Sequence, residues 1–303
     1  MPTNDIAVLN KTYGSPGRIV FREGPAGQPL VSLADSRGTC DIALYGAHVL
    51  AYDPAGQSPV LWLSQSTGTI SAGQAIRGGI PVCWPWFGAH PSDPKRPGHG
   101  FARLRRWRLL GTSYDSRQTS VRLQLTHDAE TQTIWPHAFK LEMSITLGDA
   151  LAVELTTTNK GDAPFSFSQA LHTYLRVQDI GAIRVLGLEN TAYHDVSPAA
   201  RDGRQHGAIT VTEETDRIYQ KTTGDVTLVD PGNNRRIVVG KRGSQSTVVW
   251  NPWIEKARRL ADMAHDDYQR FICIETANAE SDTVVLEPGA EHTITTTIQS
   301  TTT

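Results

Sequence analysis

Residues 77–107, RGGIPVCWPWFGAHPSDPKRPGHGFARLRRW, differ in composition from the rest of the chain. The stretch combines a Gly-Gly pair and several prolines with large aromatic side chains, which is typical neither of an alternating strand nor of a polar loop. Glycine permits positive φ or close backbone approach, and proline fixes φ. Two interpretations are open. The segment is either an ordered, irregular backbone that presents Arg77, His90, His99 and Arg103 to a small molecule, or a hydrophobic plug at a sheet edge with these groups on its rim.

Short apolar runs lie on both sides of this segment and are separated by Gly, Pro, Asp and Asn. β-branched residues dominate these runs, which predicts strands. Gly148-Asp149 between two runs indicates a hairpin. The predicted strands are 18–23, 30–34, 40–44, 48–52, 60–63, 107–114, 120–126, 139–147, 151–158, 165–177, 183–188, 217–220, 226–229, 236–240, 248–251, 271–275, 283–286 and 292–299.

Helical periodicity is nearly absent, and residues 254–265 are the best helix candidate. No repeat of fixed period and no change in composition marks an internal boundary. The sequence therefore predicts an all-β fold: a large antiparallel β-sandwich with one or two short helices, formed by residues 1–303 as a single domain.

Composition excludes several classes of partner. The net charge of −2 provides no general basic field for nucleic acid or an anionic membrane. No apolar run approaches the length of about 18 residues that a membrane span needs. The three cysteines, Cys40, Cys83 and Cys273, are far apart in sequence, which argues against a disulfide framework and a cysteine-based zinc site. The polar amino terminus has no signal-peptide pattern, so we expect a cytoplasmic protein.

Two polar residues interrupt runs that should be buried. His172 lies within FSFSQALHTYL, and Glu275 ends FICIE. A buried carboxylate must be paired, hydrogen-bonded or raised in pKa, because an uncompensated buried charge is too costly. The alternatives are a core histidine bonded to a backbone carbonyl and a strand-end glutamate that has reached water. Asp216, considered alone, fits a turn carboxylate better than a functional group.

Six segments occur in an order that resembles the aldose 1-epimerase superfamily, and specifically its hexose-phosphate branch, the glucose-6-phosphate 1-epimerases. They are RGGIPV (77–82), HGFAR (99–103) followed by Trp107, ALHTYL (170–175), TDRIY (215–219), NPW (251–253) with KA close behind, and CIE (273–275). The resemblance implies a galactose mutarotase-like β-supersandwich that interconverts the α and β anomers of a hexose 6-phosphate. It also implies that no metal or organic cofactor takes part.

The resemblance also implies a role for each matching residue. The implied roles are general acid for His172, general base for Glu275, sugar binding near the ring for His99, hydroxyl binding for Asp216, and phosphate binding for Arg77 and Arg103. Lys95 and Arg96 fall in a variable loop and are expected to be surface charges.

The reaction itself calls for these residue types. Opening a ring hemiacetal requires one group to take the proton of the anomeric hydroxyl and another to protonate the ring oxygen, which a carboxylate and an imidazole can do. The planar guanidinium of arginine suits a phosphate, because it donates two parallel hydrogen bonds.

Other functions stay open at this point. They are a mutarotase of unphosphorylated aldoses, a non-catalytic carbohydrate-binding sandwich, and a glycoside hydrolase, although hydrolases typically need two flanking carboxylates. A metal site from His90, His99 and His172 has no supporting spacing. We expect no metal or cofactor, no nucleic-acid or membrane partner, and a monomer.

Overall fold

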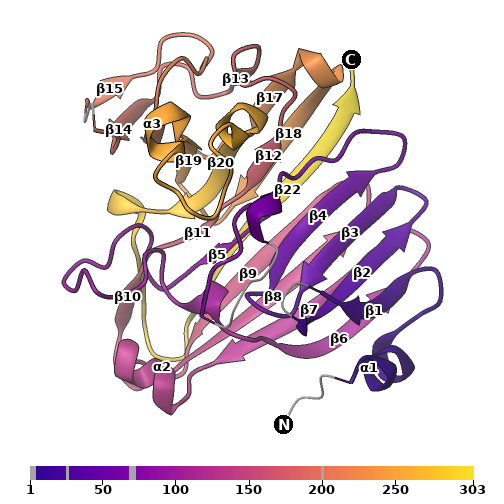
Figure 1. Cartoon of the computed structure of the whole chain (residues 1–303). Helices are drawn as coiled ribbons and strands as arrows, with labels where there is room; N and C mark the ends of the chain where they lie inside the picture. Colours follow the sequence, from indigo (N-terminus) through magenta and orange to yellow (C-terminus); the bar gives the residue numbers. More distant parts are fainter. Residues whose placement is uncertain (1–4, 25–26, 68–72, 199–200) are drawn as a thin grey trace.

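The computed structural model describes residues 5–24, 27–67, 73–198 and 201–303 (Figure 1). Antiparallel strands are its main regular structure and form two eight-stranded sheets, a four-stranded sheet and a two-stranded ladder. The predicted antiparallel β-sandwich is confirmed.

The first eight-stranded sheet spans the molecule and is continuous from β13 to β6. In spatial order it contains β13 (Arg184–Leu186), β17 (Val226–Asp230), β18 (Arg235–Arg242), β22 (Glu291–Thr302), β9 (Leu151–Asn159), β8 (Phe139–Leu147), β7 (Thr119–Thr126) and β6 (Arg108–Tyr114). The predicted hairpin at Gly148-Asp149 joins β8 to β9, in which Leu147 pairs with Leu151. Buried and partly exposed residues alternate strictly along β8, as expected for a strand with one face in a core.

The four-stranded sheet packs over the β6–β9 end of this long sheet (Figure 1). It contains β1 (Ile19–Glu23), β2 (Pro29–Asp35), β3 (Gly38–Ala43) and β4 (His48–Pro54) in sequential order.

The second eight-stranded sheet carries the residues that matter for function. Its strands are β15 (Gly203–Arg204), β14 (Ala192–Asp195), β16 (Thr215–Gln220), β19 (Ser246–Asn251), β20 (Phe271–Asn278), β11 (Gln169–Leu171) and β5 (Val82–Cys83), and β12 (Tyr174–Arg176) also pairs with β20. A separate ladder joins β10 (Phe165–Phe167) to β21 (Val284–Leu286).

Two large buried clusters lie on opposite faces of this second sheet. The larger cluster includes Ile272 and Ile274 of β20 together with core residues of the long and four-stranded sheets. The smaller cluster includes Phe271 and Cys273 of β20. β20 is therefore buried on both faces, and a polar residue on it has no direct route to water.

The predicted strand 165–177 is divided into β10, β11 and β12, and residues 60–63 form only isolated bridges. The division occurs because consecutive pieces pair with different strands: β10 with β21, and β11 and β12 with separate halves of β20. His172 and Thr173 lie in the gap between β11 and β12.

The described residues contain three α-helices: α1 (Ile6–Tyr13), α2 (Ala129–Ile134) and α3 (Trp253–Ala257). The predicted helix 254–265 is wrong beyond Ala257. The carbonyl of Asp262, which a longer helix would bond internally, instead accepts a hydrogen bond from Ser64 Oγ at 2.8 Å. The 3₁₀ turns are η2 (Gln65–Thr67), η3 (Ala102–Leu104), η4 (Pro231–Asn233), η5 (Asp267–Arg270) and η6 (Glu280–Asp282).

Helices α1 and α2 were not predicted from the sequence. Asp5 caps α1, and the Asn10 side chain exchanges two hydrogen bonds with the backbone of Phe21 in β1. Asp128 and Thr131 form a capping box on α2. Both helices bury few residues, so neither shows the apolar periodicity that sequence reasoning depends on. Within the described part of the chain, no helix has the length and apolarity to cross a membrane.

Candidate active site

The regular structure of segment 77–107 consists of the two-residue strand β5, the 3₁₀ turn η3 and isolated bridges. The backbone at positions 78 and 79 can be formed only by glycine. Gly78 and Gly79 have φ of 102° and 62°, and a Cβ on either would lie within 2.5 Å of a backbone carbonyl oxygen, that of Trp62 or Val49. Both features predicted for this pair, positive φ and close backbone approach, are confirmed.

The structure of this segment combines features of both interpretations. Its large aromatics Trp84, Phe101 and Trp107 are almost completely buried in the main core, as a plug requires. Arg77, His99 and Arg103 instead lie on the other side, together with His172 and Glu275. His90 lies apart from them, with its ring edge-on to Trp86.

Strand β20 positions Glu275. Residues alternate between the two faces of a strand, so Cys273 and Glu275 lie on the face opposite Ile272 and Ile274. Glu275 is only 1% exposed, and its Oε2 atom has no hydrogen-bond partner among the described residues. The strand-end alternative, in which Glu275 reaches water, is therefore excluded.

The gap between β11 and β12 positions His172. Its backbone N–H donates to the carbonyl of Pro81 at 3.1 Å, which ties it to the irregular segment. Its ring stacks on Tyr174 with centroids 4.7 Å apart and an interplanar angle of 13°. The ring Nδ1 lies 3.2 Å from Glu275 Oε1, so the two residues singled out by sequence form one buried pair.

Burial shifts the pKa values of His172 and Glu275 in opposite directions. It raises the pKa of Glu275 well above its ordinary value, and the nearby negative charge of Asp216 adds to this effect. Burial lowers the pKa of His172, and the positive charges around it, including Arg103 and Arg77, act in the same direction. Both shifts favour a pair with no net charge, in which one proton is held by either the carboxyl or the imidazole.

His99 lies beside the pair, with its ring centroid 5.6 Å from that of His172. Its φ of 62° is unusual for a non-glycine residue. The backbone N–H of Gly88 donates to Nδ1 of His99 at 3.3 Å. Burial, together with the charge of Arg103, lowers the pKa of His99 to about 3. The ring is therefore neutral near pH 7 and carries its proton on Nε2, which makes that nitrogen a hydrogen-bond donor.

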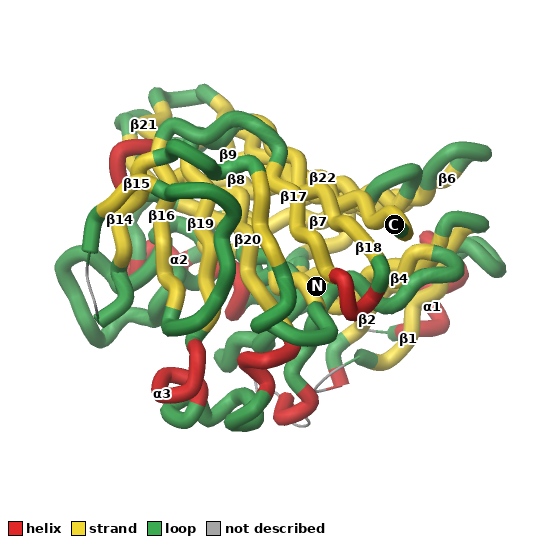
Figure 2. Tube along the Cα trace, turned by 90° about the horizontal axis from the view of Figure 1, so that it is seen from above, coloured by secondary structure: helices red, strands yellow, loops and turns green. Residues whose placement is uncertain are grey.

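Asp216 projects from β16 on the same face of the sheet. Asp216 is the cross-strand neighbour of Trp250 on β19, and Trp250 is the cross-strand neighbour of Cys273 on β20. Glu275 lies two residues beyond Cys273, on the same face of β20. Lys256 of α3 donates to Asp216 Oδ2 at 3.1 Å and also contacts Glu214 at 3.0 Å. Asp216 is thus part of a charged cluster beside the pair and is not an isolated turn carboxylate. Helix α3 follows β19 and lies beyond the ends of β16, β19 and β20 (Figure 2).

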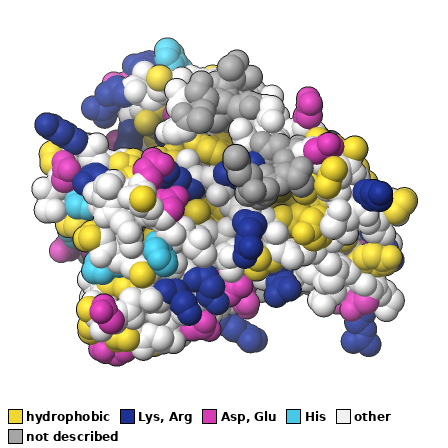
Figure 3. Space-filling model, turned by 90° about the horizontal axis from the view of Figure 1, so that it is seen from below, with side chains coloured by type: hydrophobic (Ala, Val, Ile, Leu, Met, Phe, Trp, Pro, Cys, Tyr) yellow, Lys and Arg dark blue, Asp and Glu magenta, His cyan; other side chains and the backbone are white. Residues whose placement is uncertain are grey.

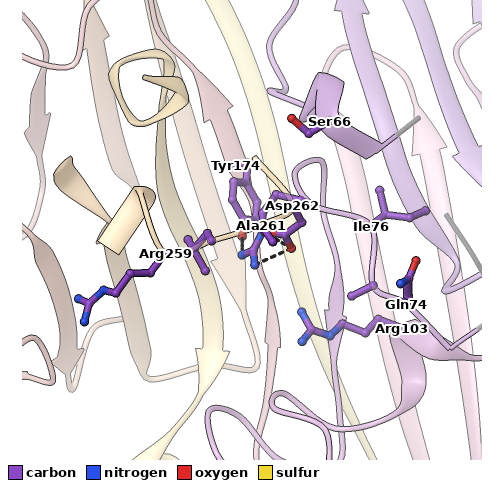
Figure 4. Close-up of a pocket in the computed structure, with 11 residues that line it drawn as sticks. Ser66, Gln74, Ile76, Arg103, Tyr174, Arg259, Ala261 and Asp262 are labelled. Atoms are coloured by element: carbon purple, nitrogen blue, oxygen red, sulfur yellow. Dashed lines mark hydrogen bonds and ion pairs between the residues drawn. The ribbon is translucent and has the colours of Figure 1, made fainter. Parts of the chain in front are cut away.

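Arg77 and Arg103 line one cleft, which has a volume of about 550 Å³ and which we call the arginine cleft (Figure 4). Ile76, Tyr174 and Asp262 also line it. Neither His172 nor Glu275 belongs to the lining, but Tyr174 connects the cleft to the pair because it lines the cleft and stacks on His172. Arg259 lines the cleft too, although its guanidinium points away from Arg103 and Asp262 (Figure 4).

The pair and the neighbouring Cys273 are the described residues whose spacing would suit a metal ion. His172, Cys273 and Glu275 place one potential ligand atom each within 4.8 Å of one another. Arg77 and Arg103 are close enough to influence the titration of both His172 and Cys83, so the surroundings carry positive charge that opposes a cation. Burial also raises the pKa of the Cys273 thiol, which disfavours the thiolate that a metal needs.

The structure brings all six candidate residues to one face, but sequence reasoning missed several neighbours. Tyr174, Trp250, Lys256 and Asp262 each contact at least one of the six. The ALHTYL segment contains Tyr174, and the NPW and KA segments lie at Trp250 and Lys256, but no role was predicted for these three residues. Lys95 is exposed, and Arg96 pairs with Asp93 at 3.3 Å, so both are surface charges.

An antiparallel supersandwich with a buried imidazole–carboxylate pair close to a polar cleft suits an enzyme that transfers protons on a small substrate. The sequence profile of the aldose 1-epimerase family matches residues 29–299, and the chain belongs to this family. It is therefore an isomerase of the epimerase type.

Two relatives share the name "Putative glucose-6-phosphate 1-epimerase". The one from Escherichia coli is 36% identical over 82% of this chain and 83% of its own length. The one from Cenchrus ciliaris is 34% identical over 88% and 83%. Among solved structures, "a putative mutarotase (YeaD)" from Salmonella typhimurium superposes with a TM-score of 0.87 and 30% identity, covering 94% of each chain. A galactose mutarotase-like protein from Lactobacillus casei, only 17% identical, shares the fold with a TM-score of 0.70 and confirms the predicted supersandwich.

Proposed function

We propose that this protein interconverts the α and β anomers of a hexose 6-phosphate, with glucose 6-phosphate as the first candidate. The observation that carries the proposal is the buried His172–Glu275 pair, 3.2 Å apart, which Tyr174 connects to the arginine cleft. The family of the chain and the names of its relatives support the same reaction.

The pair can supply both proton transfers of the reaction. Glu275 takes the proton of the anomeric hydroxyl while His172 gives a proton to the ring oxygen, and the ring opens to an aldehyde. After rotation about the C1–C2 bond, the reverse transfers close the ring on the other carbonyl face. The number of protons on the pair is unchanged at each step. Because closure reverses both transfers, each turnover ends with Glu275 and His172 in the protonation states in which it began.

Two neighbours are suited to hold the sugar. The neutral His99 ring offers its Nε2–H to a ring or hydroxyl oxygen. Asp216, which Lys256 holds in place, offers a carboxylate oxygen to sugar hydroxyls. Neither role requires a cofactor, and we propose that no metal takes part.

Arg77 and Arg103 are proposed to bind the phosphate. A hexose phosphate carries about −1.5 to −2 charges at pH 7, and two guanidinium groups in one cleft provide charge-assisted hydrogen bonds to it. The Nε atom of Arg103 is buried and has no hydrogen-bond partner among the described residues. The N–H group on Arg103 Nε is therefore available to donate a hydrogen bond to a ligand.

The decisive experiment is anomer exchange followed by NMR on glucose 6-phosphate, glucose and galactose at equal concentrations. We expect the protein to accelerate exchange of glucose 6-phosphate above its spontaneous rate and to act more weakly on the free sugars. Faster exchange of a free sugar would favour the mutarotase of unphosphorylated aldoses. Binding without any acceleration would favour a non-catalytic sandwich.

The arginines are tested on the same two kinds of substrate. Arg77→Ala or Arg103→Ala should weaken the use of glucose 6-phosphate about ten- to a hundredfold, because a hydrogen bond to a charged partner contributes roughly 1.5–3 kcal/mol. Exchange of free glucose should hardly change. Equal losses of activity on both sugars would contradict the assignment of phosphate binding and would indicate that the two arginines only stabilise segment 77–107.

We also propose that residues 1–303 form a single domain, that the protein acts in the cytoplasm as a monomer, and that it does not bind nucleic acid. The large core cluster draws residues from β1 to β22, which supports one domain. All three cysteines are unpaired and buried, which fits a reducing compartment. Basic and acidic side chains are interspersed on the face shown in Figure 3, which is unlike a basic stripe for nucleic acid.

A further inference from the structure

Arg77 is held from two sides. Its Nε and Nη2 atoms lie 3.0 and 2.9 Å from the same oxygen, Oδ2 of Asp262. Its Nη1 atom donates to the hydroxyl of Tyr174 at 2.9 Å. These contacts are the dashed lines in Figure 4. Burial alone would lower the pKa of Arg77, but Tyr174 and Asp262 more than offset this effect and raise it, so the guanidinium stays charged in the cleft.

The two partners still leave donors for a ligand. A guanidinium has five N–H groups. Asp262 engages one on Nε and one on Nη2, and Tyr174 engages one on Nη1, so one N–H on Nη1 and one on Nη2 are left over. An oxyanion in the cleft can bind these two groups without displacing either partner.

The two partners are anchored differently. Tyr174 is 1% exposed, and its ring is fixed by the stack on His172. The side chain of Asp262 is 40% exposed and lies in the segment that follows α3, where Ser64 binds its backbone carbonyl. Tyr174 thus sets where Arg77 lies relative to the acid–base pair, and Asp262 prevents the guanidinium from rotating about its long side chain.

We propose that Asp262 and Tyr174 are positioning residues that hold Arg77 ready for the substrate phosphate, so that the phosphate end and the anomeric end of the sugar are held at a fixed separation. The proposal rests on the assignment of phosphate binding to Arg77. A flexible arginine loses conformational freedom when it binds an anion, and a guanidinium already held in place loses less. The alternative is that the Asp262 carboxylate competes with phosphate for Arg77.

The two ideas predict opposite changes in KM. If Asp262 positions Arg77, Asp262→Ala should raise the KM for glucose 6-phosphate about tenfold, and inorganic phosphate should become a correspondingly weaker competitive inhibitor. Asp262→Glu, which keeps the charge, should recover part of this loss. If Asp262 competes with phosphate, Asp262→Ala should lower KM, and that result would overturn the proposal.

Tyr174→Phe is the second variant. It removes the hydroxyl but keeps the ring that stacks on His172, so KM for glucose 6-phosphate should rise severalfold while kcat changes little. Asp266→Ala is the matched control, because it removes a negative charge from the same segment at an exposed residue. KM should be unchanged in this control.

A double-mutant cycle separates positioning from a general structural role. If Asp262 acts through Arg77, the double variant Arg77→Ala/Asp262→Ala should have the same KM as Arg77→Ala alone. Additive losses would refute the proposal. The cycle also distinguishes its failure from that of the proposed function. An unchanged KM in Arg77→Ala contradicts phosphate binding itself, whereas a raised KM in Arg77→Ala with unchanged KM in Asp262→Ala and Tyr174→Phe contradicts only the positioning roles.

Discussion

Glu275 is a carboxylate on a strand that is buried on both faces, a position that would normally cost several kcal/mol for an ionised group. His172 places an imidazole nitrogen 3.2 Å away, and the positive charge of Arg103 offsets part of the cost. A core that needed only stability would be served as well by two apolar side chains of similar volume. The pair is therefore better explained by the proton transfers it can perform.

Single substitutions in the pair test this explanation. Glu275→Gln keeps the shape of the side chain but removes the base, and His172→Ala removes the acid. Each should slow anomer exchange of glucose 6-phosphate by about 10²-fold or more, the usual contribution of a general acid or base. NMR exchange rates at saturating substrate measure the effect, with circular dichroism to verify folding. Near-native rates in both folded variants would contradict the assigned roles.

The pH dependence provides a second test at this scale. As a base, Glu275 works only when ionised, so kcat/KM should fall as the pH drops below its pKa. Burial and Asp216 raise that pKa, so the fall should occur at higher pH than the value of about 4.3 for a free glutamate.

Two variants test the electrostatic origin of this shift. Asp216→Asn should move the fall in kcat/KM to lower pH, because it removes a negative charge near Glu275. Arg103→Ala should move it to higher pH, because it removes a positive one. The second ionisation of the substrate phosphate, near pH 6, belongs to the free substrate and has the same pKa with every variant, so it does not by itself produce shifts in opposite directions. Shifts in the same direction for both variants would refute the electrostatic account.

The residues that sequence could identify are those that break a pattern. His172 and Glu275 were visible because they interrupt apolar strand runs, and the family resemblance then suggested their roles. Tyr174 lies in the ALHTYL segment, but nothing marked it as functional, because a tyrosine fits a buried strand pattern. Asp262 was not visible either, since an aspartate in a predicted helix looks like ordinary surface charge. Its importance depends on a contact with Arg77, 185 positions away in the sequence, that no local pattern reports.

At the scale of elements, strand positions were largely predictable and partner changes were not. The alternating runs of β7, β8 and β9 gave strands close to the observed bounds, because one face of each is buried. The run 165–177 looked continuous because its apolar content is continuous. Its division into three strands depends on pairing with β21 and β20, which lie about a hundred residues further along the chain.

A buried ion pair links several of these elements and was not predicted. Arg235 of β18 and Asp230 of β17 are each 1% exposed and lie 3.2 Å apart. Arg235 also donates to the backbone carbonyls of Ser58, Pro59 and Arg176, which ties the loop after β4 and strand β12 to the long sheet. Removing the arginine leaves a carboxylate and three carbonyls without this donor.

We expect Arg235→Met to lower the free energy of unfolding by about 3–5 kcal/mol, the usual cost of breaking a buried pair. Arg236→Met is the matched control, because its neighbouring side chain is exposed and should contribute less than about 0.5 kcal/mol. Urea denaturation at pH 7 measures both. Equal stability of the two variants would show that the pair does not hold these elements together.

At the scale of the whole molecule, the C-terminal strand joins the two halves of the long sheet. β22 pairs with β18 from Arg242↔Thr295 to Arg235↔Thr302 and with β9 from Thr158↔Glu291 to Leu151↔Ile298. Its residues Ile294 and Ile298 are fully buried in the main core. The sheet therefore closes only when the last part of the chain is in place.

A truncation series tests this dependence. A chain that ends at Ala290 lacks β22, so β18 and β9 would each present an unpaired edge beside an exposed core, and such edges promote aggregation. We expect this protein to be insoluble or to lack a cooperative thermal transition. A chain that ends at Ser300 keeps Ile294 and Ile298 and loses only exposed residues, so its Tm should fall by no more than a few degrees. Solubility after expression and thermal unfolding by circular dichroism distinguish the two. A folded, cooperative protein that ends at Ala290 would show that the two halves of the sheet are stable without the strand between them, and the supersandwich would then have to be regarded as two independently folding parts.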